Sequence, residues 1–241
     1  MNHRSSLLAF AALGVVAGAA QASLAPLGFE DMTGTGLGAM NTVLTITSPA
    51  SGTFEQGSVG LDAGGAMVST GDTTAITQTR TLGELGVSSA ADLRIVFNAS
   101  EPGNGENGIT LSDLVLNIYS PSGALLFTSG AFSPVSFGAT ALGVGQAGFI
   151  FTLDAAQAAA AQAAAFGGDF AVNQIGLSAA AGCATTPSDS CLSATGGLET
   201  FFVTNAEGGG GVVAEVPELG TYALILAGLG AIGLVNGRRR V

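Results

Sequence analysis

The stretch Ile109-Thr110-Leu111-Ser112-Asp113-Leu114-Val115-Leu116-Asn117-Ile118 decides the fold class. Its large apolar side chains recur close to every second position, and this period is typical of an extended strand with one apolar face. The neighbouring polar residues Ser112 and Asp113 interrupt the alternation. The stretch therefore predicts a long β-strand that the pair Ser112-Asp113 could break.

Similar short runs lie on both sides of this stretch. Residues 42–47 are rich in β-branched side chains, and residues 91–97 alternate between outward and inward positions. Further candidate strands occupy residues 124–128, 148–153, 171–178 and 198–204, with roughly two or three less regular ones within 52–81. Turn-forming residues separate the runs, and the helices that a parallel sheet would require between them are missing. The sequence predicts a mainly β fold, an antiparallel β-sandwich or jelly-roll-like domain of about eight to ten strands.

One Ala-rich stretch, residues 154–168, is the exception and predicts a helix of about 12 residues. Asp154 can accept hydrogen bonds from the free amides of the first turn, and Gln157 stands three residues on, as in a capping box. Gly167 can supply the left-handed stop. Because so short a helix is marginal alone, we expect Phe166 and one alanine face to dock on a sheet edge or on an end of the sandwich.

The N-terminal residues have the three parts of a secretory signal peptide. Residues 1–4 are basic, residues 7–20 are apolar without charge, and Ala20-Gln21-Ala22 is a small-x-small cleavage site. The apolar run is shorter than the ~20 residues of a membrane-spanning anchor. We therefore predict a signal helix in residues 1–22, export by the Sec translocon, and cleavage by signal peptidase between Ala22 and Ser23.

The last residues, 216–241, combine a proline-acid turn, an apolar segment and a cluster of arginines. The turn comes first and the arginines last: Val216, Pro217 and Glu218, then Arg238, Arg239 and Arg240. Arginines resist transfer across a bilayer and hold their end of the chain in the cytoplasm. A transmembrane helix is predicted over residues 219–236. At about 1.5 Å per residue its apolar part reaches ~25 Å, short of the ~30 Å hydrocarbon core, which favours removal by a membrane enzyme over permanent anchoring.

This tail closely resembles the PEP-CTERM sorting signal of exported proteins in Gram-negative bacteria that make exopolysaccharide. Pro217 and Glu218 match the recognition positions, whereas Leu219 stands where the family has a second proline. The resemblance implies that an exosortase, a multi-pass membrane protease or transpeptidase, recognises and cuts the tail. It also implies passage through the inner membrane, transient anchoring there, and a final place at the cell surface or outside the cell. A looser resemblance to PEP-CTERM proteins of unknown role covers residues 143–157, 175–179 and 196–202.

Between the two ends lies one predicted domain, residues 23–206, joined to the tail by a flexible glycine-rich linker, residues 207–215. The chain has a formal net charge of -11, and only Arg80 and Arg94 are basic within the domain. Nucleic-acid binding depends on Lys and Arg side chains that neutralise phosphates. Nucleic acid is therefore excluded as a partner.

Missing side chains exclude most familiar enzymes. The only histidine, His3, belongs to the predicted signal peptide, and the chain contains no lysine and no tryptophan. Without histidine the mature chain lacks Ser-His-Asp and Cys-His nucleophile systems and the commonest zinc and iron ligand. Chemistry that needs only carboxylates remains, for example glycoside hydrolysis. The sequence predicts a protein that is not an enzyme.

The two cysteines, Cys183 and Cys191, are predicted to form a disulfide, because export places the chain in an oxidising compartment. Closing so short a loop stabilises the fold by about 2 to 3 kcal/mol on the chain-entropy model. Seven intervening residues argue against the C-x-x-C spacing of a redox centre. The bond is predicted to be structural.

The most polar loop, residues 97–108, offers a candidate calcium site. Its oxygen ligands would come from the loop and from the following strand: Glu101, Asn104, Glu106, Asn107 and Asp113. A solvated hairpin loop rich in turn formers accounts for the same residues. No other cofactor is predicted.

The sequence therefore predicts a non-catalytic exported protein of the cell surface or extracellular matrix, associated with exopolysaccharide in a biofilm. A carbohydrate- or calcium-binding module on the same export route is the alternative, and a carboxylate-based glycosidase is the third reading. Sugar sites commonly stack rings on aromatics, but the domain has one tyrosine, Tyr119, and many of its phenylalanines follow strand patterns typical of a core. Those phenylalanines are Phe97, Phe127, Phe149, Phe151, Phe201 and Phe202.

Overall fold

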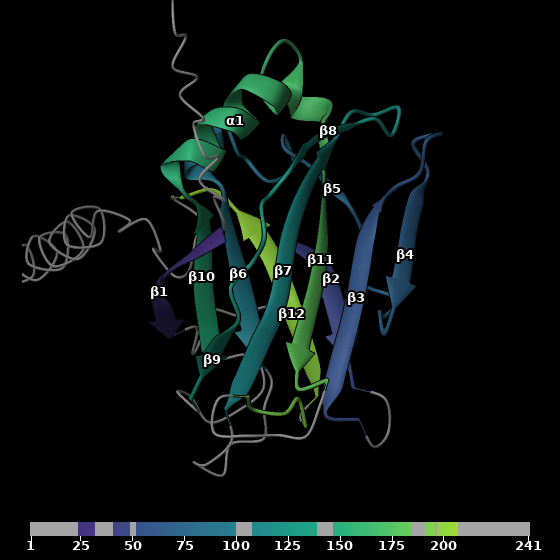
Figure 1. Ribbon diagram of the computed structural model, residues 1–241. Helices are drawn as coiled ribbons and strands as arrows, with labels where there is room; N and C mark the ends of the chain where they lie inside the picture. The colour runs from purple at the N-terminus through teal and green to yellow at the C-terminus, as the bar shows by residue number, and fades with distance from the viewer. Residues whose placement is uncertain are drawn as a thin grey trace, which may run out of the picture.

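The computed structural model describes residues 24–31, 41–48, 52–99, 108–138, 147–184, 191–195 and 197–206. Within these ranges the protein is mainly β, with antiparallel sheets and one α-helix, as predicted (Figure 1). The strands are β1 (Leu24–Asp31), β2 (Thr42–Thr47), β3 (Phe54–Leu61), β4 (Met67–Gly71), β5 (Arg80–Thr81), β6 (Arg94–Ala99), β7 (Ile109–Tyr119), β8 (Leu125–Thr128), β9 (Val135–Phe137), β10 (Ala147–Leu153), β11 (Gln174–Gly182) and β12 (Leu198–Thr204). The helices are α1 (Ala155–Ala165) and two 3-10 turns, η2 (Ala90–Asp92) and η3 (Phe170–Val172).

The strands form two sheets. Sheet A has five strands in the order β1-β10-β6-β12-β2. Sheet B follows the order β4-β3-β11-β7-β8, and β5 pairs with β11 while β9 pairs with β7. Most pairs join strands that are far apart in the sequence, so the order rests on long-range packing rather than on local hairpins.

Most predicted strands are present, with corrections at their ends. β2 and β12 have the predicted bounds, and the region 52–81 contains β3, β4 and β5. β6 begins at Arg94 because η2 occupies the residues before it, and β11 begins at Gln174 because η3 does the same there. Two strands are not predicted from the sequence: β1, which contains a proline and a glycine, and β9, which is too short to show a period.

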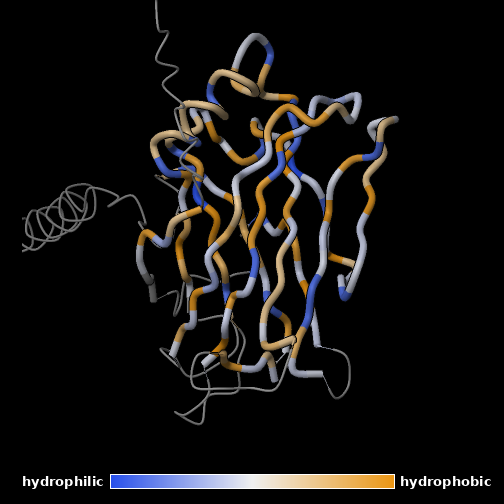
Figure 2. Tube along the Cα trace, viewed as in Figure 1, coloured by the Kyte–Doolittle hydropathy of each residue, from blue (hydrophilic) through white to orange (hydrophobic). Residues whose placement is uncertain are grey.

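One hydrophobic core lies between the two sheets, and apolar stretches recur along the strands of both (Figure 2). Phe149, Phe97 and Phe201 are direct neighbours across β10, β6 and β12. The Phe97 and Phe201 rings stack with centroids 4.9 Å apart. The phenylalanines predicted to be core residues are all buried: Phe97, Phe127, Phe149, Phe151, Phe201 and Phe202. Phe202 belongs to a separate small cluster with Val96 and Ile150.

Residues 109–118 belong to one strand, β7, which a bulge distorts but does not break. Asp113 pairs with Ala180 and Leu111 with Ala181, so Ser112 is an extra residue on β7. Its hydroxyl donates a hydrogen bond to the Gly182 carbonyl, 2.7 Å away. The extra residue resets the alternation, so the apolar side chains on both sides of the bulge reach the core.

Helix α1 covers one end of the sheets (Figure 1). Asp154 caps it by accepting a hydrogen bond from the Gln157 amide at 2.9 Å, as predicted. Ala161, Ala165 and Phe166 are buried against the core, which confirms the predicted docking face.

The predicted glycine stop of α1 is wrong by one residue. Gly168, not Gly167, has positive φ (59°). Phe166 ends the helix with its amide still bonded to the Gln162 carbonyl, and its ring packs 5.5 Å from that of Phe170. The chain therefore reverses one residue later than the sequence suggests.

Candidate functional site

The outer face of sheet B carries a row of hydroxyl groups. Thr70 on β4 pairs with Ser58 on β3, and Ser58 pairs with Ser178 on β11. Neighbouring strands lie about 4.8 Å apart, so the three side chains stand side by side across three strands. The hydroxyl oxygens of Ser58 and Thr70 are 2.8 Å apart and share a hydrogen bond.

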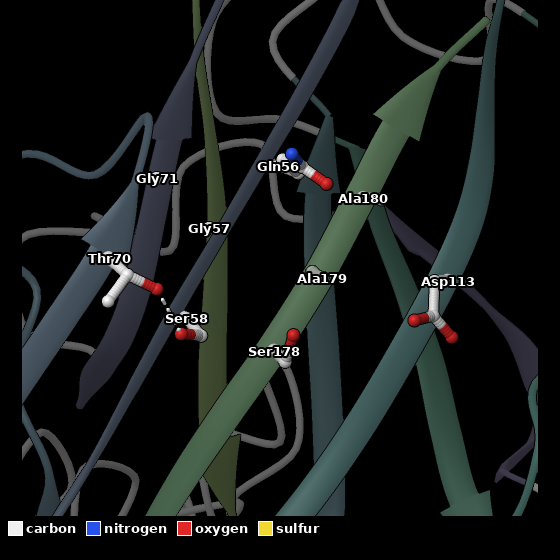
Figure 3. A pocket seen from close by; sticks show the side chains of 9 residues that line it. All are labelled: Gln56, Gly57, Ser58, Thr70, Gly71, Asp113, Ser178, Ala179 and Ala180. Carbon is white, nitrogen blue, oxygen red and sulfur yellow. Dashed lines mark hydrogen bonds between the residues drawn. The ribbon is translucent and has the colours of Figure 1, made fainter. Parts of the chain in front are cut away.

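A second polar row lies beside the first and contains a gap. Gln56 on β3 pairs with Ala180 on β11, and Ala180 pairs with Asp113 on β7. Because Ala180 is small, the space between the amide and the carboxylate stays open (Figure 3). The resulting hollow measures about 280 Å³ and is lined by Gln56, Gly57, Ser58, Thr70, Gly71, Asp113, Ser178, Ala179 and Ala180.

An aromatic ring lies on the same face, beyond the hydroxyl row that lines the hollow. Tyr119 lies on β7, and Gly60 and Gly176 are the next outward positions beyond Ser58 and Ser178, about 7 Å further along their strands. A Cβ added at Gly60 would stand 2.7 Å from the Tyr119 hydroxyl oxygen, and one added at Gly176 would stand 3.1 Å from its Cε2. The ring therefore lies across these two glycines and fills the place of their missing side chains.

The side chains of this face suit a neutral, hydroxyl-rich ligand. Hydroxyl groups donate and accept hydrogen bonds, the Gln56 amide does both, and the Asp113 carboxylate accepts them. The Tyr119 hydroxyl is protonated at neutral pH and can donate a hydrogen bond, and burial raises its pKa further above the ordinary value. The residues that line the hollow include no cationic side chain, which disfavours a phosphate or a polyanion.

Two buried acids were not singled out from the sequence. Glu55 on β3 and Glu199 on β12 are fully buried, and neither lines the hollow. The Ser48 hydroxyl donates to Glu55 Oε2 at 3.2 Å, and it also contacts the Ala194 carbonyl. The strand alternation gives the only sequence signal for them, since both occupy positions where the period calls for an apolar residue.

The predicted site residues are only partly covered by the described residues. The disulfide between Cys183 and Cys191 is present, as predicted. Asp113 lies on the outer face of sheet B. Every other predicted site residue lies outside the described residues: Ala20, Ala22 and Ser23 of the cleavage site; Glu101, Asn104, Glu106 and Asn107 of the calcium loop; and Val216, Pro217, Glu218, Arg238, Arg239 and Arg240 of the tail.

Among the described residues, no group of three or more His, Cys, Asp or Glu side chains is placed to hold a metal ion. No helix within them is long and apolar enough to cross a membrane. The predicted transmembrane helix, residues 219–236, lies outside the described ranges, as do the signal peptide, residues 1–22, and the linker, residues 207–215.

Comparison of the chain with protein-family models, with curated proteins and with solved structures gave no match. The functional interpretation of the hollow and of the ring beside it therefore rests on their own geometry and chemistry.

Proposed function

We propose that the protein is a non-catalytic, exported domain of the bacterial cell surface or extracellular matrix. The disulfide between Cys183 and Cys191 carries the proposal, because such bonds form and persist in oxidising compartments outside the cytosol. The signal-peptide pattern of residues 1–22 supports the same route. In this proposal the two sheets, which share one core, form a jelly-roll-like β-sandwich. The sandwich is a stable scaffold that presents a binding face.

The C-terminal tail is proposed to direct the last step of this route. An exosortase in the inner membrane of a Gram-negative cell removes the tail, and the glycine-rich linker keeps the cutting site away from the folded domain. The released domain then joins the exopolysaccharide of the surface. The order of turn, apolar segment and arginines in residues 216–241 supports this step.

Exchanging Pro217 and Glu218 for alanine is expected to stop the processing of the tail. Wild-type chains should convert to a smaller species at the cell surface when the sorting protease is present, and the double variant should stay full-length in the inner membrane. Immunoblots of fractionated cells measure both forms. Glu207→Ala, an acid in the linker, is the matched control and should be processed normally. An unchanged full-length membrane species of the wild type, with and without the protease, contradicts the proposal.

A second candidate function is the binding of a neutral polysaccharide on the outer face of sheet B. The observation that favours it is the Tyr119 ring beside a hollow lined with hydroxyl, amide and carboxylate groups. Sugar rings stack on aromatic side chains, and their hydroxyls pair with such polar groups. The calcium alternative stays a prediction, because four of its five residues lie outside the described ranges.

Replacing Tyr119 with alanine is expected to weaken this binding about tenfold, because a lost aromatic contact of about 1.4 kcal/mol corresponds to that factor. Affinity electrophoresis of the purified full chain in gels that contain soluble neutral glucans gives the dissociation constants. Tyr119→Phe keeps the ring over the two glycines and should bind nearly as well as the wild type. Equal retardation of the wild type and Tyr119→Ala would remove the support for this site.

A further inference from the structure

Strand β4 forms one edge of sheet B and is exposed along its whole length. Figure 1 shows it at the right-hand side of the molecule, beyond β3. Its five residues are all exposed, including the apolar side chains of Met67 (48 %) and Val68 (45 %). Among the described residues, β3 is the only strand that pairs with it.

Two hydrogen bonds at the ends of β4 fix which of its backbone groups face outward. The Asp62 amide donates to the Ala66 carbonyl at 2.9 Å, and the Asp72 amide donates to the Gln56 carbonyl at 2.7 Å. In an antiparallel ladder, alternate residues direct both backbone groups to the same neighbour. The even-numbered residues therefore bond to β3, whereas Met67, Ser69 and Gly71 direct their groups to the open edge.

The edge lacks the devices that normally prevent strand addition, which are charged side chains, proline and bulges. The sequence Met67-Val68-Ser69-Thr70-Gly71 has neither charge nor proline, and its pairing with β3 has no register shift. Asp62 and Asp72 flank β4, but their carboxylates accept hydrogen bonds from backbone amides of the hairpin and of β3. Asp62 Oδ1 accepts from the Gly64 and Ala66 amides at 2.8 and 2.9 Å. Asp72 Oδ2 accepts from the Gln56 amide of β3 at 3.0 Å.

We infer that the open edge of β4 pairs with β4 of a second copy of this chain, antiparallel and centred on Ser69. In this two-fold register Met67 stands opposite Gly71 of the second copy, so the longest side chain meets a residue without one. Val68 stands opposite Thr70 as a β-branched pair, which stabilises neighbouring strands. The outward backbone N–H and C=O groups of Met67, Ser69 and Gly71 then form hydrogen bonds to the second copy. The B sheets of the two copies join into one continuous sheet.

Charge selects a second copy over a basic peptide as the occupant. The chain is strongly acidic overall, yet β4 is neutral, and both flanking carboxylates already bond to the hairpin and β3. A basic peptide would therefore find no carboxylate directed to the open edge. In the two-fold register Asp72 stands opposite Ala66 of the second copy, and Asp62 lies on the other side of Ala66, where its amide bonds to the Ala66 carbonyl. Two strand spacings, about 10 Å, therefore separate the Asp72 Cα atom of one copy from the Asp62 Cα atom of the other, which exceeds the screening length of about 8 Å.

A strand of this length buries little surface, so the dimer is expected to be weak and concentration-dependent. The interaction is separate from the proposed glycan binding and from the export route. Its failure would leave both untouched.

Single cysteines provide the sharpest test, because the only native cysteines are joined in a disulfide. In the two-fold register the Cα atoms of the two Ser69 residues lie about 5.5 Å apart, within the range of a disulfide. The two Thr70 residues are offset by two positions, at about 9 Å, which a disulfide cannot span. After mild oxidation of the purified full chain, Ser69→Cys should form a covalent dimer on a non-reducing gel, whereas the matched Thr70→Cys should not.

Either no dimer from Ser69→Cys or equal cross-linking of both variants would overturn the inference, since equal yields indicate random collision or contact elsewhere. A cross-linked product of another mass would identify a different occupant and would overturn the inference too.

Sedimentation velocity gives an independent readout. Ser69→Lys places two ammonium groups face to face and should abolish the concentration-dependent dimer of the wild type. Leu125→Lys adds the same charge at β8, on another edge strand, and should leave the dimer intact. Loss of the dimer in Leu125→Lys, or a dimer that persists in Ser69→Lys, contradicts the pairing.

Discussion

Replacing Phe97 with alanine is expected to lower the free energy of unfolding by about 3 to 5 kcal/mol. The Phe97 side chain is completely buried on β6, between β10 and β12 in sheet A. Its ring stacks on Phe201 at 4.9 Å and contacts Phe149 and Phe137 at 6.0 and 6.1 Å. Strands on both sides of Phe97 limit how far the neighbours can collapse into the cavity, so the cost falls in the upper range for large-to-small substitutions.

Urea titration of the purified full chain, followed by far-UV circular dichroism, measures this loss as a shift of the midpoint at constant slope. Leu125→Ala removes an apolar side chain that is 54 % exposed on β8. This matched control should change the free energy of unfolding by no more than about 0.5 kcal/mol. A loss below about 1 kcal/mol for Phe97→Ala would mean that the phenylalanine row is not the centre of the core.

Removing the disulfide by the double substitution of Cys183 and Cys191 with alanine is expected to cost about 2 to 3 kcal/mol of the free energy of unfolding. The bond closes a loop with a sequence separation of 8 and holds the end of β11 near the segment that precedes β12. The Cys183 and Ala194 amides both donate to the Thr53 carbonyl, at 2.9 and 3.0 Å. The unfolded chain without the bond gains conformational freedom, which lowers the relative stability of the folded state.

The same urea titration with and without dithiothreitol separates the bond from the side chains. Reductant should lower the midpoint of the wild type to nearly that of the double variant, and it should leave the double variant unchanged. A wild-type midpoint that does not respond to full reduction, checked by thiol titration, would show that the loop contributes no stability.

Features set by neighbouring residues could be predicted from the sequence. The apolar period of residues 109–118 is enough to locate β7, and Asp154 with the alanines after it locates the start of α1. The pairing of Cys183 with Cys191 follows from their count and spacing. Each of these depends on contacts within a few residues, where period and capping preferences act directly.

The candidate binding face could not be predicted, because it depends on how distant strands are aligned. In the sequence, Tyr119 is an isolated aromatic residue. Only the register of β7, β11 and β3 places its ring across Gly176 and Gly60. Asp113 is predicted from the sequence as a calcium ligand beside the polar loop, but the bulge at Ser112 turns it onto the outer face, where Ala180 stands between it and Gln56. A shift of one residue in any of these strands would send the same side chains to the opposite face.

The position of the last strand sets the time at which folding can finish. β12 lies in the interior of sheet A, between β6 and β2, although it is the final described element of the chain. A polypeptide that emerges with its N-terminus first must therefore hold β2 and β6 without their shared neighbour until residues 198–204 arrive. During that interval both strands lack the neighbour that pairs their backbone groups, and such open edges are the ones that other chains can join. A chain truncated before Leu198 would never bring these two halves of sheet A together.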